Sequence, residues 1–208
     1  MILIFGDSHT SAFSIDNDVE FMIPDEKLIK KDVFSSYRTL PYTCYNIYNK
    51  KELICNFLKT ITINHDDIVF FSYGETDIRC HIGFNIVNNN EDEIIHNVVI
   101  NYIKLLIYIK SKFNFKVGCY FPIASGIYNG VNGNGRNSFK NDIERNKLTL
   151  KFNEKLQKEC IKYNILYKDI SKKLMDENLQ TKNDYYCDGV HLGIKSKQIL
   201  LDEFHDFI

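Results

Sequence analysis

Short apolar runs that alternate with longer helical patterns constrain the fold of this chain more than any other feature. Four of these runs are typical of buried strands, since they are apolar, rich in branched or aromatic residues and followed by turn residues. They span residues 1–5, 67–73, 116–123 and 165–170. A further strand is predicted over Tyr42–Tyr48, which is rich in aromatic and branched residues and directly follows a proline.

Amphipathic helices are predicted between these strands. Apolar residues recur at helical spacing over 52–60, 91–112, 139–163 and 194–207. Strands that alternate with helices predict one α/β domain over residues 1–208, a three-layer sandwich with a mostly parallel sheet of about five strands flanked by helices. From Ser8 to residue 32 no periodicity is sustained, and we expect a loop with a short helix there.

Composition and charge narrow the classes of partner. The formal net charge of -1 provides no overall attraction to nucleic acid or to acidic membranes, so we expect neither as a partner. The six cysteines include no C-x-x-C pair, and we expect them to be reduced. The first apolar run is too short for a signal peptide, and no apolar stretch approaches the ~20 residues of a membrane span, so we expect a cytoplasmic protein.

Three stretches of turn and polar residues follow predicted strands directly. Gly6-Asp7-Ser8-His9 follows the first strand, residues 74–81 follow the strand at 67–73, and a loop at 124–138 that contains Ser125 and four glycines follows the strand at 116–123. The carboxyl ends of parallel strands lie at one edge of a sheet, so we expect the three stretches to converge.

Ser8, Asp188 and His191 are the candidates for nucleophilic catalysis. Asp188 and His191 are three residues apart, so both side chains can face the same way in a turn. An aspartate that hydrogen-bonds one imidazole nitrogen fixes the tautomer, and the other nitrogen can then accept a proton from a serine hydroxyl. Taken singly, each feature also fits a plain role, with Ser8 or Asp188 capping a helix and His191 on the surface.

Ionisable residues alternate in the stretch after the middle strand: Glu75, Asp77, Arg79 and His81. A guanidinium such as Arg79 is suited to bind a carboxylate or phosphate with two hydrogen bonds. An ion pair of Arg79 with Glu75 or Asp77 that holds the loop is an equally good interpretation. In the loop at 124–138, sugar-type contacts are predicted for Tyr128, Asn129, Asn132 and Arg136, with a plain surface loop as the alternative.

The motifs together resemble the SGNH (GDSL-type) hydrolases. Gly6-Asp7-Ser8-His9 is similar to their first block, Gly74-Glu75-Thr76-Asp77 stands where their third block G-x-N-D is expected, and Asp188-Gly189-Val190-His191 is similar to their last block. The resemblance implies an SGNH/flavodoxin-like fold and no cofactor. It also implies that Ser8 is the nucleophile, His191 the general base and Asp188 its orienting partner, with the Ser8 N–H as one oxyanion donor.

The sequence departs from that pattern at two oxyanion donors. Thr76 replaces the third-block asparagine, and no glycine between Gly6 and Gly74 matches the second block, although a backbone N–H within 39–43 can replace it. The third block resembles a G-E-x-D-x-R-x-H variant found beside carbohydrate-modifying genes. From this resemblance, the candidates for oxyanion or substrate contacts in the third block are Thr76, Glu75, Asp77, Arg79 and His81. His9, which is next to the nucleophile in sequence, is a further candidate.

The predicted function is a serine esterase that acts on an acyl ester, with acetyl favoured, of a carbohydrate. Two alternatives share the fold: a catalytically weak protein that binds a glycan or nucleotide, and a sugar O-acyltransferase. A metal-dependent phosphoesterase is disfavoured. Gly6–His9 also matches G-D-x-H, and Asn64–Asp66 matches N-H-D, two motifs of a phosphoesterase metal site. However, Asn64–Asp66 precedes the middle strand instead of following a later one, and the sequence contains no G-H-x-H. We therefore predict no metal site.

Overall fold

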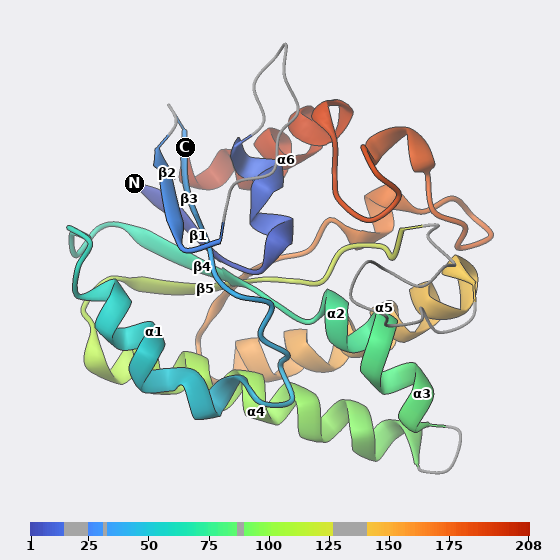
Figure 1. Ribbon diagram of the computed structural model, residues 1–208, viewed down its shortest axis with the longest axis horizontal. Helices are drawn as coiled ribbons and strands as arrows, with labels where there is room; N and C mark the ends of the chain where they lie inside the picture. The colour runs from blue at the N-terminus through green and yellow to red at the C-terminus, as the bar shows by residue number, and fades with distance from the viewer. Residues whose placement is uncertain (15–24, 31–32, 87–89, 127–140) are drawn as a thin grey trace.

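The computed structural model describes residues 1–14, 25–30, 33–86, 90–126 and 141–208. Over these residues the chain forms a six-stranded sheet with the order β2-β3-β1-β4-β5-β6 (Figure 1). The strands are β1 (Ile2–Gly6), β2 (Lys27–Lys30), β3 (Phe34–Arg38), β4 (Ile68–Ser72), β5 (Lys116–Tyr120) and β6 (Leu166–Lys168). Only β2 runs antiparallel to its neighbour, which confirms the predicted α/β class with a mostly parallel sheet.

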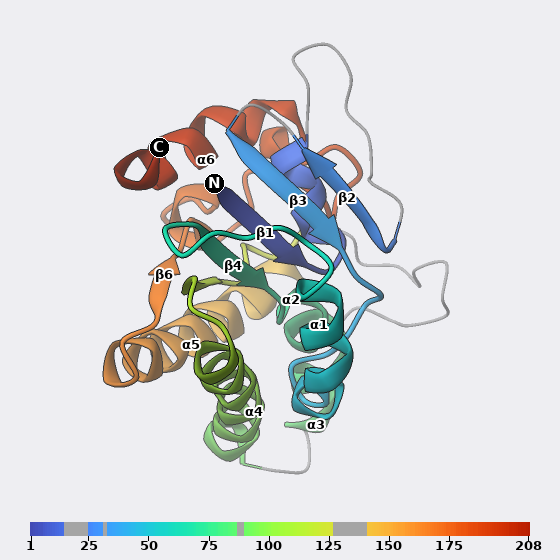
Figure 2. The same ribbon diagram turned by 90° about the vertical axis from the view of Figure 1, so that its left-hand side faces the viewer.

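Helices cover both faces of the sheet. On one face lie α1 (Lys51–Leu58), α4 (Glu91–Lys112) and α5 (Asp142–Lys162), and on the other lie the 3-10 helix η1 (Ser8–Ser14) and α6 (Lys197–Phe204), as Figure 2 shows in end view. After β4 come α2 (Glu75–Asp77), the π-helical turn η3 (Ile78–Ile82) and α3 (Gly83–Asn85). The remaining elements are short 3-10 turns: η2 (Ile47–Lys50), η4 (Ser171–Leu174), η5 (Asn183–Tyr185), η6 (Ile194–Ser196) and η7 (His205–Phe207).

Two apolar clusters form the core, one on each face of the sheet. Along β1, Leu3 and Phe5 join the cluster under α1, α4 and α5, whereas Ile2 and Ile4 join the cluster under η1 and α6. This split follows from the strand geometry, in which successive side chains point to opposite faces. A strand that is buried on both faces is typically a near-continuous apolar run, which is the pattern of β1 in the sequence.

The long helices match their predictions closely. The α4 helix begins after Asn90, whose side chain accepts a hydrogen bond from the Glu93 N–H at 3.2 Å, and α5 begins after Asn141 in the same way. By length and composition alone α4 would be able to cross a membrane. Eight of its residues are buried in this fold, which is the pattern of a core helix.

The sequence-based prediction of a strand at Tyr42–Tyr48 is wrong. This segment is a turn followed by η2, and the strand beside β1 is β3. The Cys44 and Tyr45 N–H groups donate to the Asp77 carboxylate, so they are not available to a neighbouring strand. β3 was not predicted because two of its four buried residues are serines, and β2 lies in a stretch that was predicted to be a loop with a short helix. The sheet therefore has six strands instead of about five.

Candidate active site

Ser8 follows a turn that is held on both sides by the neighbouring strands. The Asp7 N–H donates to Ser72 O at 3.2 Å on β4, and the Thr39 N–H donates to Gly6 O at 2.6 Å from the end of β3. A Cβ atom on Gly6 would lie 2.1 Å from Ser72 O, so only glycine allows the two strands to approach this closely. The turn thus fixes where the Ser8 side chain stands at the carboxyl edge of the sheet.

Ser8, His191 and Asp188 form a continuous hydrogen-bonded chain. The Ser8 Oγ lies 2.8 Å from His191 Nε2, and His191 Nδ1 lies 2.6 Å from Asp188 Oδ2. Burial alone would raise the pKa of Asp188, but hydrogen bonds from the His191 ring and from backbone N–H groups hold that pKa well below its usual range. The Asp188 carboxylate is therefore ionised near neutral pH and can orient the imidazole, which in turn can accept the serine proton.

The loop that carries Asp188 and His191 is shaped by its own backbone. The other oxygen of the Asp188 carboxylate, Oδ1, accepts the Val190 N–H at 2.9 Å and the His191 N–H at 2.7 Å. On its far side the loop packs against Gly126, where an added Cβ atom would lie 1.7 Å from Gly189 O. The site therefore depends on close contact between the segment after β5 and the Asp188–His191 turn.

Arg145 of α5 supports that contact from inside the protein. It is fully buried, and it donates from Nε to Ser125 Oγ at 2.8 Å and from Nη2 to Gly126 O at 2.7 Å. Burial lowers the pKa of the Arg145 guanidinium, although not enough to neutralise so strong a base. Arg145 could not be predicted from the sequence, because an arginine among the polar positions of a long helix carries no signal of burial.

Four ionisable side chains are buried directly behind the Ser8 turn: Asp7, His9, Glu75 and Arg79. His9 Nδ1 lies 3.0 Å from Asp7 Oδ1, its Nε2 lies 3.8 Å from Glu75 Oε2, and Arg79 Nε donates to Glu75 Oε1 at 2.8 Å. Burial by itself would lower the pKa of His9, but the Asp7 and Glu75 carboxylates outweigh it and raise that pKa. The Glu75–Arg79 ion pair is one of the two interpretations that the sequence left open.

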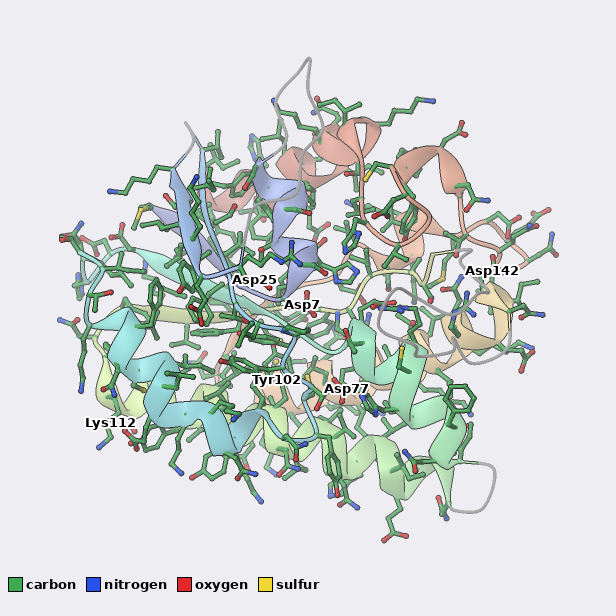
Figure 3. All side chains as sticks on the ribbon, in the orientation of Figure 1. Asp7, Asp25, Asp77, Tyr102, Lys112 and Asp142 are labelled. Carbon is green, nitrogen blue, oxygen red and sulfur yellow. The ribbon has the colours of Figure 1, made fainter. Side chains whose placement is uncertain are left out.

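Asp77 faces away from this group. Figure 3 shows Asp7 beside the start of η1 and Asp77 on the α4 side of the sheet. Asp77 is fully buried, and its carboxylate accepts the Cys44 N–H at 2.6 Å and the Tyr45 N–H at 3.2 Å. Burial raises the pKa of Asp77 to about 7, with the two backbone hydrogen bonds opposing the shift. This geometry makes Asp77 a link between the third block and the loop after β3.

Backbone and hydroxyl donors near Ser8 differ in their availability. In the stretch 39–43, the Thr39 N–H donates to Gly6 O and the Tyr42 N–H donates to Leu40 O, while Pro41 has no N–H. Within the described part of the chain, this leaves Leu40 and Thr43 as the residues of that stretch whose N–H groups have no protein acceptor. The partly exposed Thr76 hydroxyl likewise makes no hydrogen bond to a described residue.

A groove with many carboxamides runs along the far side of the third block. Two adjoining hollows of about 360 and 400 Å³ share Tyr45, Asn46 and Asn97, and we call them together the amide groove. Its other lining residues are Thr43, His81, Ile82, Asn85, Ile94, Val98, Asn49, Ile100, Asn101 and Lys104. Asn101 Nδ2 donates to Tyr45 O at 3.0 Å, so the wall that carries the exposed Tyr45 ring is anchored to α4.

The remaining candidates from the sequence are the loop residues at 128–136 and the Asn64–Asp66 stretch. Tyr128, Asn129, Asn132 and Arg136 fall outside the described residues. The Asn64–Asp66 stretch precedes β4 and therefore lies at the amino edge of the sheet, opposite Ser8. In the part of the chain that the structure describes, no group of three or more His, Cys, Asp or Glu residues is arranged to hold a metal ion, and all six cysteines are free.

Comparisons with known proteins bear on the fold. No protein-family model matches the chain, and no curated protein matches it in sequence. Among solved structures, the OSK domain of Drosophila Oskar aligns with a TM-score of 0.59 at 12% identity, over 98% of this chain and 86% of that one. A GDSL-like lipase from Bacteroides thetaiotaomicron aligns with a TM-score of 0.58 at 14% identity, over 99% of this chain and 86% of that one.

An esterase structure matches over its whole length. The acetyl xylan esterase AlAXEase aligns with a TM-score of 0.58 at 15% identity and covers 100% of both chains. Identities this low are informative about the fold and do not transfer an activity. The chain shares the fold of this GDSL-like lipase and this acetyl xylan esterase, in agreement with the α/β fold that its sequence predicted.

Proposed function

We propose that this protein is a serine esterase that hydrolyses an acyl ester, with acetyl favoured, of a carbohydrate. The observation that carries the proposal is the hydrogen-bonded chain from Ser8 Oγ to His191 Nε2 at 2.8 Å and from His191 Nδ1 to Asp188 at 2.6 Å. These distances fall within the range that proton transfer from a serine to a histidine requires. The fold shared with lipase and esterase structures supports the same conclusion.

The reaction proceeds through an acyl-enzyme. Ser8 Oγ attacks the ester carbonyl carbon while His191 Nε2 takes the hydroxyl proton, and the Asp188 carboxylate stabilises the imidazolium that forms. The tetrahedral intermediate collapses, and His191 gives its proton to the leaving sugar oxygen. Water, activated by the same imidazole, then attacks the acyl-serine, so that a carboxylic acid leaves and Ser8 is restored.

Charge on the former carbonyl oxygen needs hydrogen-bond donors near Ser8. We assign the Ser8 N–H and the Thr76 hydroxyl to this role, together with the N–H of Thr43 or Leu40. Each of these groups is without a protein partner in the described part of the chain, so no existing hydrogen bond has to break. A hydroxyl in place of a carboxamide retains one donor, and loss of one such donor typically costs on the order of 10²–10³ in rate.

The amide groove is suited to the sugar portion of the substrate. Carboxamides both donate and accept hydrogen bonds, as sugar hydroxyls do, and the exposed Tyr45 ring offers an apolar face. In its described lining Lys104 stands among five carboxamides, so hydrogen bonding is the main interaction that the groove offers a ligand. Its walls come from α4 and from the segments after β3 and β4, the two strands that flank β1 and Ser8.

Substitution of Ser8 and His191 tests the chemistry. We expect Ser8→Ala and His191→Ala to abolish hydrolysis of p-nitrophenyl acetate and of acetylated xylo-oligosaccharides, with folding unchanged by circular dichroism. Ser111→Ala, at an exposed serine in the last turn of α4, is the matched control and should keep the wild-type rate. Full activity of Ser8→Ala would show that another group is the nucleophile.

Substitution in the groove tests the substrate class. Loss of one carboxamide that binds a hydroxyl costs about 0.5–1.5 kcal/mol, so Asn97→Ala should lower kcat/KM on the acetylated oligosaccharide about 2- to 10-fold. The same variant should leave p-nitrophenyl acetate hydrolysis unchanged. Asn56→Ala, at an exposed position on α1, is the control. Equal effects of Asn97→Ala on both substrates would argue against a sugar at this groove.

A further inference from the structure

The four buried ionisable residues behind Ser8 leave several polar atoms without a protein partner. These atoms are Asp7 Oδ2, His9 Nε2, Glu75 Oε2, Arg79 Nη1 and, nearby on β5, the Tyr120 hydroxyl. An unpaired polar atom in a protein interior costs on the order of 1–3 kcal/mol, so several of them around one space call for a common partner.

A small cavity lies between these atoms. Its volume is about 10 Å³, and Asp7, His9, Glu75 and Tyr120 all line it, as do residues of the segment after β5. That volume is about the minimum that holds one water molecule, and a stable internal water needs two to four polar partners. The lining offers both donors and acceptors, since carboxylate oxygens accept, a protonated imidazole donates, and a phenol does either.

His9 connects this cavity to the catalytic histidine. Its ring is 5% exposed, and its centroid lies 5.2 Å from that of His191, with the two planes tilted by 40°. One edge of the ring is held by Asp7, whose Oδ1 also accepts the His9 N–H at 3.0 Å. The other edge points toward Glu75 Oε2, which at 3.8 Å is too distant for a direct hydrogen bond.

We propose that His9 is a positioning residue that, with one internal water molecule bound to Asp7, Glu75 and Tyr120, locks the Ser8 turn to the third block and supports the His191 ring from behind. The catalytic part of this proposal rests on the proposed esterase activity, whereas the water site and the state of His9 do not. Removal of the ring would let the His191 imidazole rotate away from Ser8. Misplacement of a catalytic group by about 1 Å can cost on the order of 10²-fold in rate.

The charges in the cluster favour a protonated His9. Asp7 and Glu75 supply two negative charges within contact of the ring, and Arg79 neutralises Glu75 through the 2.8 Å bond. An imidazolium balances the remaining carboxylate, in agreement with the raised pKa of His9. His191 faces the same ring from the loop after β6, and Tyr120 faces the cavity from β5.

The structural arm of the test uses the wild-type protein. In ¹⁵N-edited spectra of the histidine rings at pH 7, we expect the two His9 nitrogens to show the pattern of a doubly protonated ring, with His96→Gln used to assign an exposed histidine. A crystal structure at atomic resolution should show one ordered water within 3.2 Å of the polar atoms of Asp7, Glu75 and Tyr120. A neutral His9 in a dry cavity would overturn the proposal, whether or not the protein is an esterase.

The kinetic arm separates positioning from folding. His9→Gln should lower kcat for p-nitrophenyl acetate about 10- to 100-fold with little change in KM, while His9→Phe, which keeps a ring against His191, should recover part of that loss. His96→Gln should match the wild type. An unchanged kcat in folded His9→Gln refutes the positioning role, whereas an inactive wild type with a protonated His9 refutes the proposed function alone.

Discussion

The buried carboxyl group of Asp77 should make the stability of the protein fall as pH rises. Its pKa is raised from 3.8 to about 7, chiefly by burial. In the unfolded chain the carboxyl loses its proton near pH 4, whereas the folded protein keeps the proton until about pH 7. Between these values the folded state binds more protons than the unfolded state, so the free energy of unfolding decreases with increasing pH.

The magnitude follows from the shift. About three pKa units at 1.36 kcal/mol each correspond to ~4 kcal/mol of stability that is present below pH 4 and lost by about pH 7. Asp77→Asn removes the titration, because a carboxamide is neutral throughout. Its oxygen can still accept one of the two N–H groups of Cys44 and Tyr45, and the lost hydrogen bond adds a pH-independent cost of about 1–3 kcal/mol.

Urea unfolding monitored by circular dichroism at pH 4, 5, 6, 7 and 8 measures this effect. The stability of the wild type minus that of Asp77→Asn should fall by ~4 kcal/mol from pH 4 to pH 8, which isolates Asp77 from other titrating groups. Asp184→Asn, at a side chain that is 87% exposed, is the control substitution. Parallel stability curves for the wild type and Asp77→Asn would refute the reasoning.

Three further substitutions probe the site and the core. Gly126→Ala places a methyl group 1.7 Å from Gly189 O and should displace the loop that carries His191, lowering kcat on p-nitrophenyl acetate on the order of 10²-fold; wild-type kinetics would contradict this packing. Asp188→Asn should lower kcat on the order of 10⁴-fold in the same assay while the fold persists, and a small effect would mean that His191 needs no orienting carboxylate. Phe204→Ala removes a fully buried ring and should cost about 3–5 kcal/mol in urea unfolding.

Much of the fold was predictable because its central strands are buried on both faces. Every residue of Ile2–Gly6 and Ile68–Ser72 is buried, so both strands are apolar runs that can be recognised in the sequence. Their carboxyl ends also indicate the edge of the sheet at which Ser8 lies. Phe34–Arg38 was missed because small serines fill tight space beside β1 and are indistinguishable from loop residues in a single sequence. Tyr42–Tyr48 was misassigned because a distant carboxylate, Asp77, captures its N–H groups.

In the candidate site, the contacts that could be predicted are those between residues of one short motif. Asp188 and His191 are close in sequence, so their hydrogen bond followed from spacing, and the sheet order brought Ser8 to them. The sequence left the pairing of Arg79 with Glu75 or Asp77 open, since both spacings are compatible with a contact. The buried Arg145 had no sequence signal, because its partners are a hydroxyl and a carbonyl on another segment.

The bond between Ser8 and His191 joins residues that are 183 positions apart in sequence. Ser8 follows β1 and His191 precedes α6, so the elements between them must pack before the two residues can meet. Contacts of such separation close late, since the entropy of a long loop must be overcome first. For the proposed esterase, recovery of activity during refolding would therefore report completion of the fold.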